Sequence, residues 1–151
     1  MNKTDFYQSM LGQVEAVIAG ETDAIANMAN ISAILFHAFD DVNWAGFYRV
    51  KNNELILGPF QGQVACIHIP IGRGVCGTAV ATKQTQLVTN VHEFEGHIAC
   101  DASSNSEIVI PVYKDNDIIA VLDIDSTRIG RFDEQDKQGL ERIVKALEAQ
   151  L

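Results

Sequence analysis

Residues 106–126 read SEIVIPVYKDNDIIAVLDIDS, and this pattern indicates a β-hairpin. Two runs rich in apolar and β-branched residues, 106–113 and 117–125, flank the polar pair Asp115-Asn116. Asn and Asp favour tight turns because their short side chains hydrogen-bond nearby backbone and tolerate left-handed conformations. The stretch therefore predicts two antiparallel strands joined by a short turn.

Helices and further strands are expected on both sides of this hairpin. Apolar residues at helical spacing predict two helices near the N-terminus, the first capped by Thr4 and ended by Gly20, the second capped by Thr22. Asp133 is expected to cap a final helix. Strand-like stretches lie at 44–50, 55–59, 66–69 and 87–89, with a short helix at 75–83. This order predicts an α+β fold, a single domain over 1–151 with helices packed on a mainly antiparallel sheet.

The charge balance limits the classes of partner. The chain carries 20 acidic and 11 basic residues, a net charge of −9, which repels nucleic acid and suits a cationic or zwitterionic small molecule. No apolar run approaches the roughly 18–20 residues of a membrane span, and the N-terminus lacks a signal-peptide pattern. We therefore expect a cytoplasmic protein that binds neither nucleic acid nor membrane.

Three carboxylates are candidates for a site at one end of the hairpin. Asp123 and Asp125 share one face of their strand, and Glu107 stands near the open end of the strand before it. A simple two-residue turn would put Glu107 on the opposite face, so we expect a longer loop or a bulge at Pro111. Clustered carboxylates raise one another's pKa and can both hold an ammonium group and deliver a proton. The plainer interpretation is a solvated strand end.

The three cysteines are either packing groups or reactive thiols, because a cytosolic chain rarely keeps structural disulfides. Cys76 lies in the first turn of the short helix, where the positive end of the helix dipole favours a thiolate. Cys100 lies in the polar, irregular segment 90–105, and loops of that length are commonly functional. Cys66 shares a strand face with His68. These positions indicate a redox-active thiol, and helix position alone favours Cys76 as the attacking one.

Two other patterns have plainer explanations. GRGVCG at 72–77 matches the glycine pattern of dinucleotide-binding loops, but Pro70 interrupts the preceding strand and no second parallel half follows. We expect these glycines to serve a tight turn and close helix packing. The histidines and cysteines lack the close spacing of zinc ligands, so neither a metal nor a cofactor is expected.

Aromatic residues gather in one predicted strand. Trp44 is the only tryptophan, and Phe47 and Tyr48 follow it closely. They indicate either an aromatic wall of a pocket or ordinary core packing.

Five blocks occur along the chain in one order: WAGFY at 44–48, GRGVCG at 72–77, HIACD at 97–101, SEIVIP at 106–111 and LDIDS at 122–126. Taken together, the chain resembles the free methionine-(R)-sulfoxide reductases, a branch of the GAF-domain fold, from about Gln8 to the C-terminal helix. The three cysteines also fall at the family's spacing. The resemblance implies a six-stranded antiparallel sheet, a homodimer, and reduction of free L-methionine (R)-S-oxide in repair of oxidative damage, with thioredoxin as reductant.

The resemblance also implies roles for the thiols. Cys100 is the expected attacking thiol, with Cys66 its disulfide partner and Cys76 an alternative partner. Attack on the sulfoxide sulfur requires a proton on the departing oxygen, for which we expect Glu107, and next Asp125. The resulting sulfenic acid would condense to a disulfide that thioredoxin reduces.

Substrate binding is expected to use the acidic cluster and the aromatic residues. Asp123 and Asp125, with Glu107, would bind the substrate ammonium. Trp44 would pack against the S-methyl group and Tyr48 would help close the pocket, with the long polar loop ordered over the substrate. The alternative function is a GAF module that binds a small metabolite without converting it. Such sensors usually accompany an output domain and do not need three thiols.

Overall fold

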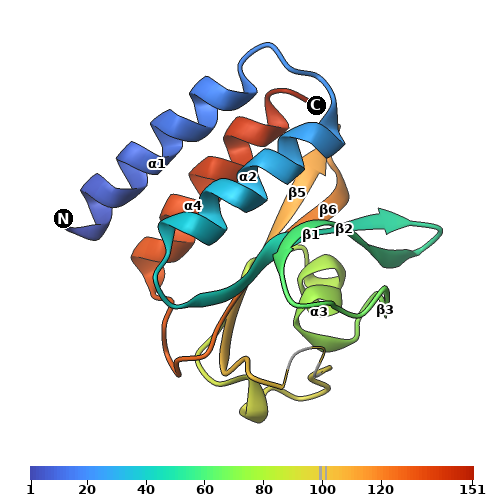
Figure 1. Cartoon of the computed structure of the whole chain (residues 1–151). Coiled ribbons are helices and arrows are strands. Elements are labelled where there is room, and N and C mark those ends of the chain that lie inside the picture. The colour runs from blue at the N-terminus through green and yellow to red at the C-terminus, as the bar shows by residue number, and fades with distance from the viewer. Residues whose placement is uncertain (99, 101) are drawn as a thin grey trace.

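Six antiparallel strands form one sheet in the order β3-β2-β1-β6-β5-β4 (Figure 1). The computed structural model describes residues 1–98, 100 and 102–151, so Ala99 and Asp101 of the HIACD block lie outside the described residues. The strands are β1 (Val42–Lys51), β2 (Glu54–Gly62), β3 (His68–Pro70), β4 (Gln86–Val88), β5 (Ser106–Lys114) and β6 (Asp117–Ser126). The predicted α+β fold with a six-stranded antiparallel sheet is confirmed.

Helices cover both faces of the sheet, and the sheet separates the hydrophobic core into two clusters. The helices are α1 (Lys3–Ile18), α2 (Ala24–Ala38), α3 (Gly74–Thr82) and α4 (Glu134–Glu148), with a short 3₁₀ turn η1 (Val91–Glu93). α1, α2 and α4 lie on one face, and α3 lies on the other (Figure 1). Phe47 and Leu122 are buried in the first core, whereas Trp44 and Val121 are buried in the second, beneath α3. Across the described part of the chain, every helix falls short of the length and apolarity that a bilayer span demands.

The caps of two helices differ from the predicted ones. Helix α1 is capped by Asn2 rather than Thr4, and α2 by Asp23 rather than Thr22. In each case the side chain of the observed cap accepts a hydrogen bond from the backbone N–H three residues on, at 2.8 and 3.0 Å. An amide or carboxylate oxygen at that spacing satisfies one of the unpaired N–H groups of the first turn. Asp133 caps α4 as predicted and forms a capping box.

The register of the β5–β6 hairpin sets the geometry of the acidic residues. The turn residues 115–116 both have positive φ, +52° and +70°, as a two-residue type I′ turn requires. A β-bulge then adds Ile119 on β6, and beyond it Glu107 pairs with Asp125. The prediction of a bulge at Pro111 is wrong in position, because Pro111 pairs regularly. The bulge at Ile119 has the same consequence, since a shift of one residue exchanges the faces of a strand.

Candidate active site

A pocket lies between the sheet and the elements that cover its α3 side. Strands β1, β5 and β6 supply its floor and the start of α3 one wall. Its rim consists of residues 64–65 together with His97, Ile98, Cys100 and Ser104. It encloses a cavity of about 40 Å³. Most of the predicted site residues line it, namely Trp44, Tyr48, Cys76, Cys100, Glu107, Asp123 and Asp125.

The three carboxylates meet in this pocket, where Glu107 and Asp123 are buried and Asp125 is half-buried. Glu107 is 7% exposed and Asp123 is 5% exposed. Burial raises the pKa of Glu107 well above its ordinary value, and the charges of Asp123 and Asp125 raise it further. Burial also raises the pKa of Asp123, although its hydrogen bonds with Glu107 and Cys76 partly oppose that shift. These shifts favour retention of a proton within the cluster, and Glu107 is the group best placed to carry it.

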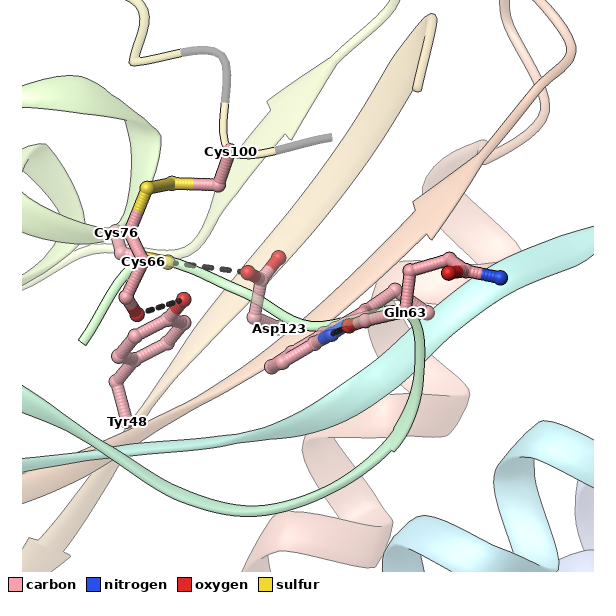
Figure 2. Close-up of a disulfide and its surroundings, with 7 residues drawn as sticks. Tyr48, Gln63, Cys66, Cys76, Cys100 and Asp123 are labelled. Carbon is pink, nitrogen blue, oxygen red and sulfur yellow. Dashed lines mark hydrogen bonds between the residues drawn. A yellow bond between two sulfur atoms is a disulfide. The ribbon is translucent and has the colours of Figure 1, made fainter. Parts of the chain in front are cut away.

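Cys76 is a buried thiol that faces this cluster. Its Sγ donates a hydrogen bond to Asp123 Oδ2 at 3.3 Å, as Figure 2 shows. Burial raises the pKa of Cys76 well above its ordinary value, and the neighbouring carboxylates add to the shift. The expectation of a thiolate at the helix start is therefore wrong, because burial and like charges outweigh the helix dipole.

A disulfide joins Cys66 to Cys100 beside the pocket, with a Cα–Cα distance of 5.4 Å (Figure 2). These are the two cysteines paired by the family resemblance, and Cys76 is left as the free thiol. The prediction of a strand starting at Cys66 is wrong, because β3 begins at His68. The exposed His68 pairs instead with Glu54 on the neighbouring strand β2.

Trp44 and Tyr48 form an aromatic wall, stacked with their ring centroids 5.7 Å apart. The Trp44 indole N–H donates to the carbonyl of Gln63 at 3.1 Å, which fixes the ring. Phe47 is not part of the wall, because alternation along β1 places it in the opposite core. Phe60 of β2 takes that place instead, stacked on Trp44 at 5.1 Å.

The position of Gly46 in the sequence indicates that a large side chain, here Phe60, packs against this part of β1. Gly46 lies between Trp44 and Tyr48 and pairs with Phe60 across the two strands. A Cβ atom at position 46 would lie 2.3 Å from the Cβ of Phe60, so only glycine lets this ring approach. Glycine inside a strand commonly marks such close contact. Phe60 thus supports the aromatic wall from behind Trp44, whereas the lining residues Val64 and Ile98 come from irregular segments whose pattern carries no comparable signal.

The glycines of the GRGVCG block serve the turn before α3. Gly72 and Gly74 have positive φ values of +91° and +65°. A Cβ atom at Gly77 would lie 2.5 Å from the carbonyl oxygen of Pro70. These constraints account for all three glycines without a bound dinucleotide.

One group of possible metal ligands occurs among the described residues. The ligand atoms of Cys76, Glu107 and Asp123 all lie within 4.8 Å of one another. The pKa of each of these groups is raised by burial, so a cation would first have to displace their protons.

Comparisons with known proteins identify the family of this chain. A family model of the GAF domain matches residues 24–149. The chain is 57% identical to the free methionine-R-sulfoxide reductase of Escherichia coli over 148 residues, which cover 98% of this chain and 90% of that protein. This chain belongs to the free methionine-R-sulfoxide reductase family. The resemblance drawn from the five sequence blocks is confirmed.

Solved structures of the family superimpose closely on the chain. The reduced form of fRMsr of Staphylococcus aureus matches with a TM-score of 0.94 and 56% identity, covering 96% of this chain and 94% of that one. The free methionine-R-sulfoxide reductase from Neisseria meningitidis, in complex with its substrate, matches with a TM-score of 0.96 and 46% identity, covering 99% and 90%. The family is therefore one of enzymes whose fold extends over essentially the whole of this chain.

Proposed function

We propose that this protein reduces free L-methionine (R)-S-oxide to L-methionine by thiol chemistry. One observation carries the proposal: the Cys66–Cys100 disulfide lies beside a pocket that holds three carboxylates and an aromatic wall. The substrate complex of the Neisseria meningitidis relative supports a substrate site in this fold.

In the proposed reaction Cys100 attacks the sulfoxide sulfur as a thiolate. Cys100 suits this role because it lines the pocket, whereas the buried Cys76 holds its proton against Asp123. Glu107 donates a proton to the departing oxygen, which its raised pKa makes available at neutral pH. Methionine leaves, and Cys100 remains as a sulfenic acid.

The second half of the reaction forms the disulfide. The Cys66 thiol condenses with the sulfenic acid of Cys100 and releases water, which leaves the bond that the structure contains. One sulfoxide and two thiols thus become one thioether, one disulfide and one water. Thioredoxin then returns the pair to thiols by exchange.

The acidic cluster accounts for a preference for the free amino acid. Asp123 Oδ1 is buried and has no hydrogen-bond partner, so an ammonium group at this position would satisfy it. With Asp125 it would hold the substrate amine, while Trp44 contacts the S-methyl group and Tyr48 closes the pocket. A methionine within a protein chain presents an uncharged amide there and loses that pairing.

The decisive experiment incubates the protein with dithiothreitol and racemic methionine sulfoxide and measures methionine by chromatography. Consumption of half the racemate is expected, and Cys100→Ser should form no methionine even in a single turnover. A protein that binds the sulfoxide without forming methionine would instead be a sensor module.

Two further attributes belong to the same proposal. We expect a homodimer, which light scattering after size-exclusion chromatography tests directly. We also expect a cytoplasmic location, where thioredoxin is available as reductant. Fractionation of cells that express the protein checks this location.

A further inference from the structure

Three exposed apolar side chains lie close to Cys66 along the chain. Val64 is 87% exposed, Ile67 is 59% exposed and Ile71 is 37% exposed. Cys66 lies between the first two of them. We call Val64, Ile67 and Ile71 the apolar collar. Large apolar side chains grouped on the surface commonly mark a place where another molecule binds.

The backbone of the collar segment is held in place by hydrogen bonds to the carbonyls of Cys66 and Ile67. The Tyr48 hydroxyl donates to the carbonyl of Cys66 at 3.0 Å, as Figure 2 shows. The Leu57 N–H donates to the carbonyl of Ile67 at 2.9 Å, and the chain then enters β3. The backbone thus presents these side chains to solvent from a fixed position at the edge of the sheet. A preformed surface costs little ordering entropy when a partner binds it.

The two sulfurs of the disulfide have different surroundings. Cys100 lines the pocket together with Glu107 and Asp123. Cys66 lies within the collar segment, next to the exposed Ile67. Both cysteines are half-buried, and only Cys100 is among the residues that line the pocket.

We propose that the apolar collar is the docking surface for the dithiol protein that reduces the disulfide, and that this partner attacks Cys66. The proposal rests on the proposed function, because only a disulfide that forms in each turnover needs repeated reduction. A small thiol needs no apolar surface, whereas a protein must bury one to bring its thiolate onto a disulfide sulfur. The chain's net charge of −9 also disfavours an anionic lipid surface as the occupant.

The exchange balances without any other reactant. The partner's thiolate forms a bond to Cys66 Sγ, and the S–S bond breaks so that Cys100 leaves as a thiolate on the pocket side. The partner's second thiol, after losing its proton, attacks the partner sulfur of the mixed disulfide and releases Cys66. The partner is oxidised to a disulfide, and both cysteines are reduced. Attack at Cys66 therefore restores the attacking thiol in the place where it meets substrate.

The first test compares two reductants on variants of the collar. The double variant Ile67→Ser with Ile71→Ser alters neither the pocket lining nor a residue of the proposed chemistry. With thioredoxin as the dithiol protein, its KM for thioredoxin should rise about tenfold, because apolar area that the partner would cover is lost; this factor corresponds to roughly 1.4 kcal/mol of binding free energy. With dithiothreitol, turnover should match the parent protein. Ile25→Ser, which removes a 45% exposed isoleucine from α2 on the far side of the sheet, is the matched control and should leave both rates unchanged.

The second test identifies the attacked sulfur. Thioredoxin in which the second active-site cysteine is replaced by serine should form a stable mixed disulfide with this protein, and peptide mapping should find it on Cys66. Conjugation to Cys100, or an unchanged KM for thioredoxin in the double variant, would overturn the proposal. Failure of the proposed function gives a different result, because no methionine would then form with dithiothreitol either.

Discussion

Replacing Glu107 with glutamine separates the proposed proton donor from the fold that holds it. Glutamine has nearly the same size and shape as a protonated glutamic acid, so the buried pocket has no cavity to fill. Glutamine also retains hydrogen bonding to the neighbouring carboxylates, but it cannot release a proton. The substitution should therefore slow the chemical step and leave the packing of the pocket intact.

The rate of the chemical step should fall by about 10²- to 10⁴-fold, the usual contribution of a positioned acid. This loss corresponds to roughly 3–5 kcal/mol in the activation free energy. The KM for the sulfoxide should change little, because the proposed ammonium contact at Asp123 remains. Single-turnover methionine formation by the reduced protein measures the chemical step directly.

The folding stability should increase at neutral pH, because burial raises the pKa of Glu107 above its ordinary value of 4.5. Between pH 4.5 and the raised pKa the native state binds more protons than the unfolded state, so this carboxyl reduces stability as pH rises. Glu107→Gln removes that loss. Its advantage in the free energy of unfolding should be small at pH 4.5 and grow towards pH 8, as urea denaturation at several pH values measures. A rate within tenfold of the parent protein, or a stability difference independent of pH, would refute the role of Glu107 as a buried acid.

Three further substitutions test other parts of the site and fold. Asp123→Asn should raise the KM for free methionine sulfoxide about 10- to 100-fold, as expected for loss of a charged hydrogen bond. The same substitution should barely change the reduction of N-acetylated methionine sulfoxide, which has no ammonium group. Equal effects on both substrates would exclude an ammonium contact. Cys76→Ala should still lose two thiols per equivalent of substrate, counted with a thiol-reactive chromophore, because Cys76 lies outside the disulfide; loss of a single thiol would make it a redox partner. Tyr7→Phe removes a buried 2.6 Å hydrogen bond to Asp136 and should cost about 1.5–3 kcal/mol of unfolding free energy with unchanged turnover; an unaltered urea midpoint would contradict that contribution.

The location of the site followed from the sequence because its residues lie in recognisable blocks. LDIDS and SEIVIP place their acids at one end of two adjacent strands, and alternation along a strand fixes which side chains share a face. The same alternation, applied strictly to WAGFY, would have excluded Phe47 from the aromatic wall. Local patterns of this kind depend only on neighbours along the chain.

The state of each group in the site depended on contacts between distant segments. Cys76 at a helix start has the local pattern of a thiolate, yet packing against β6 buries it beside carboxylates that keep it protonated. The position of the bulge at Ile119 likewise depends on how two whole strands pair, which the turn residues do not specify.

The amino-acid sequence by itself determined the order of elements, the α+β class, the shared face of Asp123 and Asp125, and the family, because each depends on local spacing and residue type. Only the tertiary structure decided which thiol is buried, which phenylalanine stacks on Trp44, and which cysteine of the disulfide lines the pocket. The burial of a side chain and its interaction with neighbouring charges depend on residues far apart in the chain. Both are therefore set only when the sheet and α3 pack together.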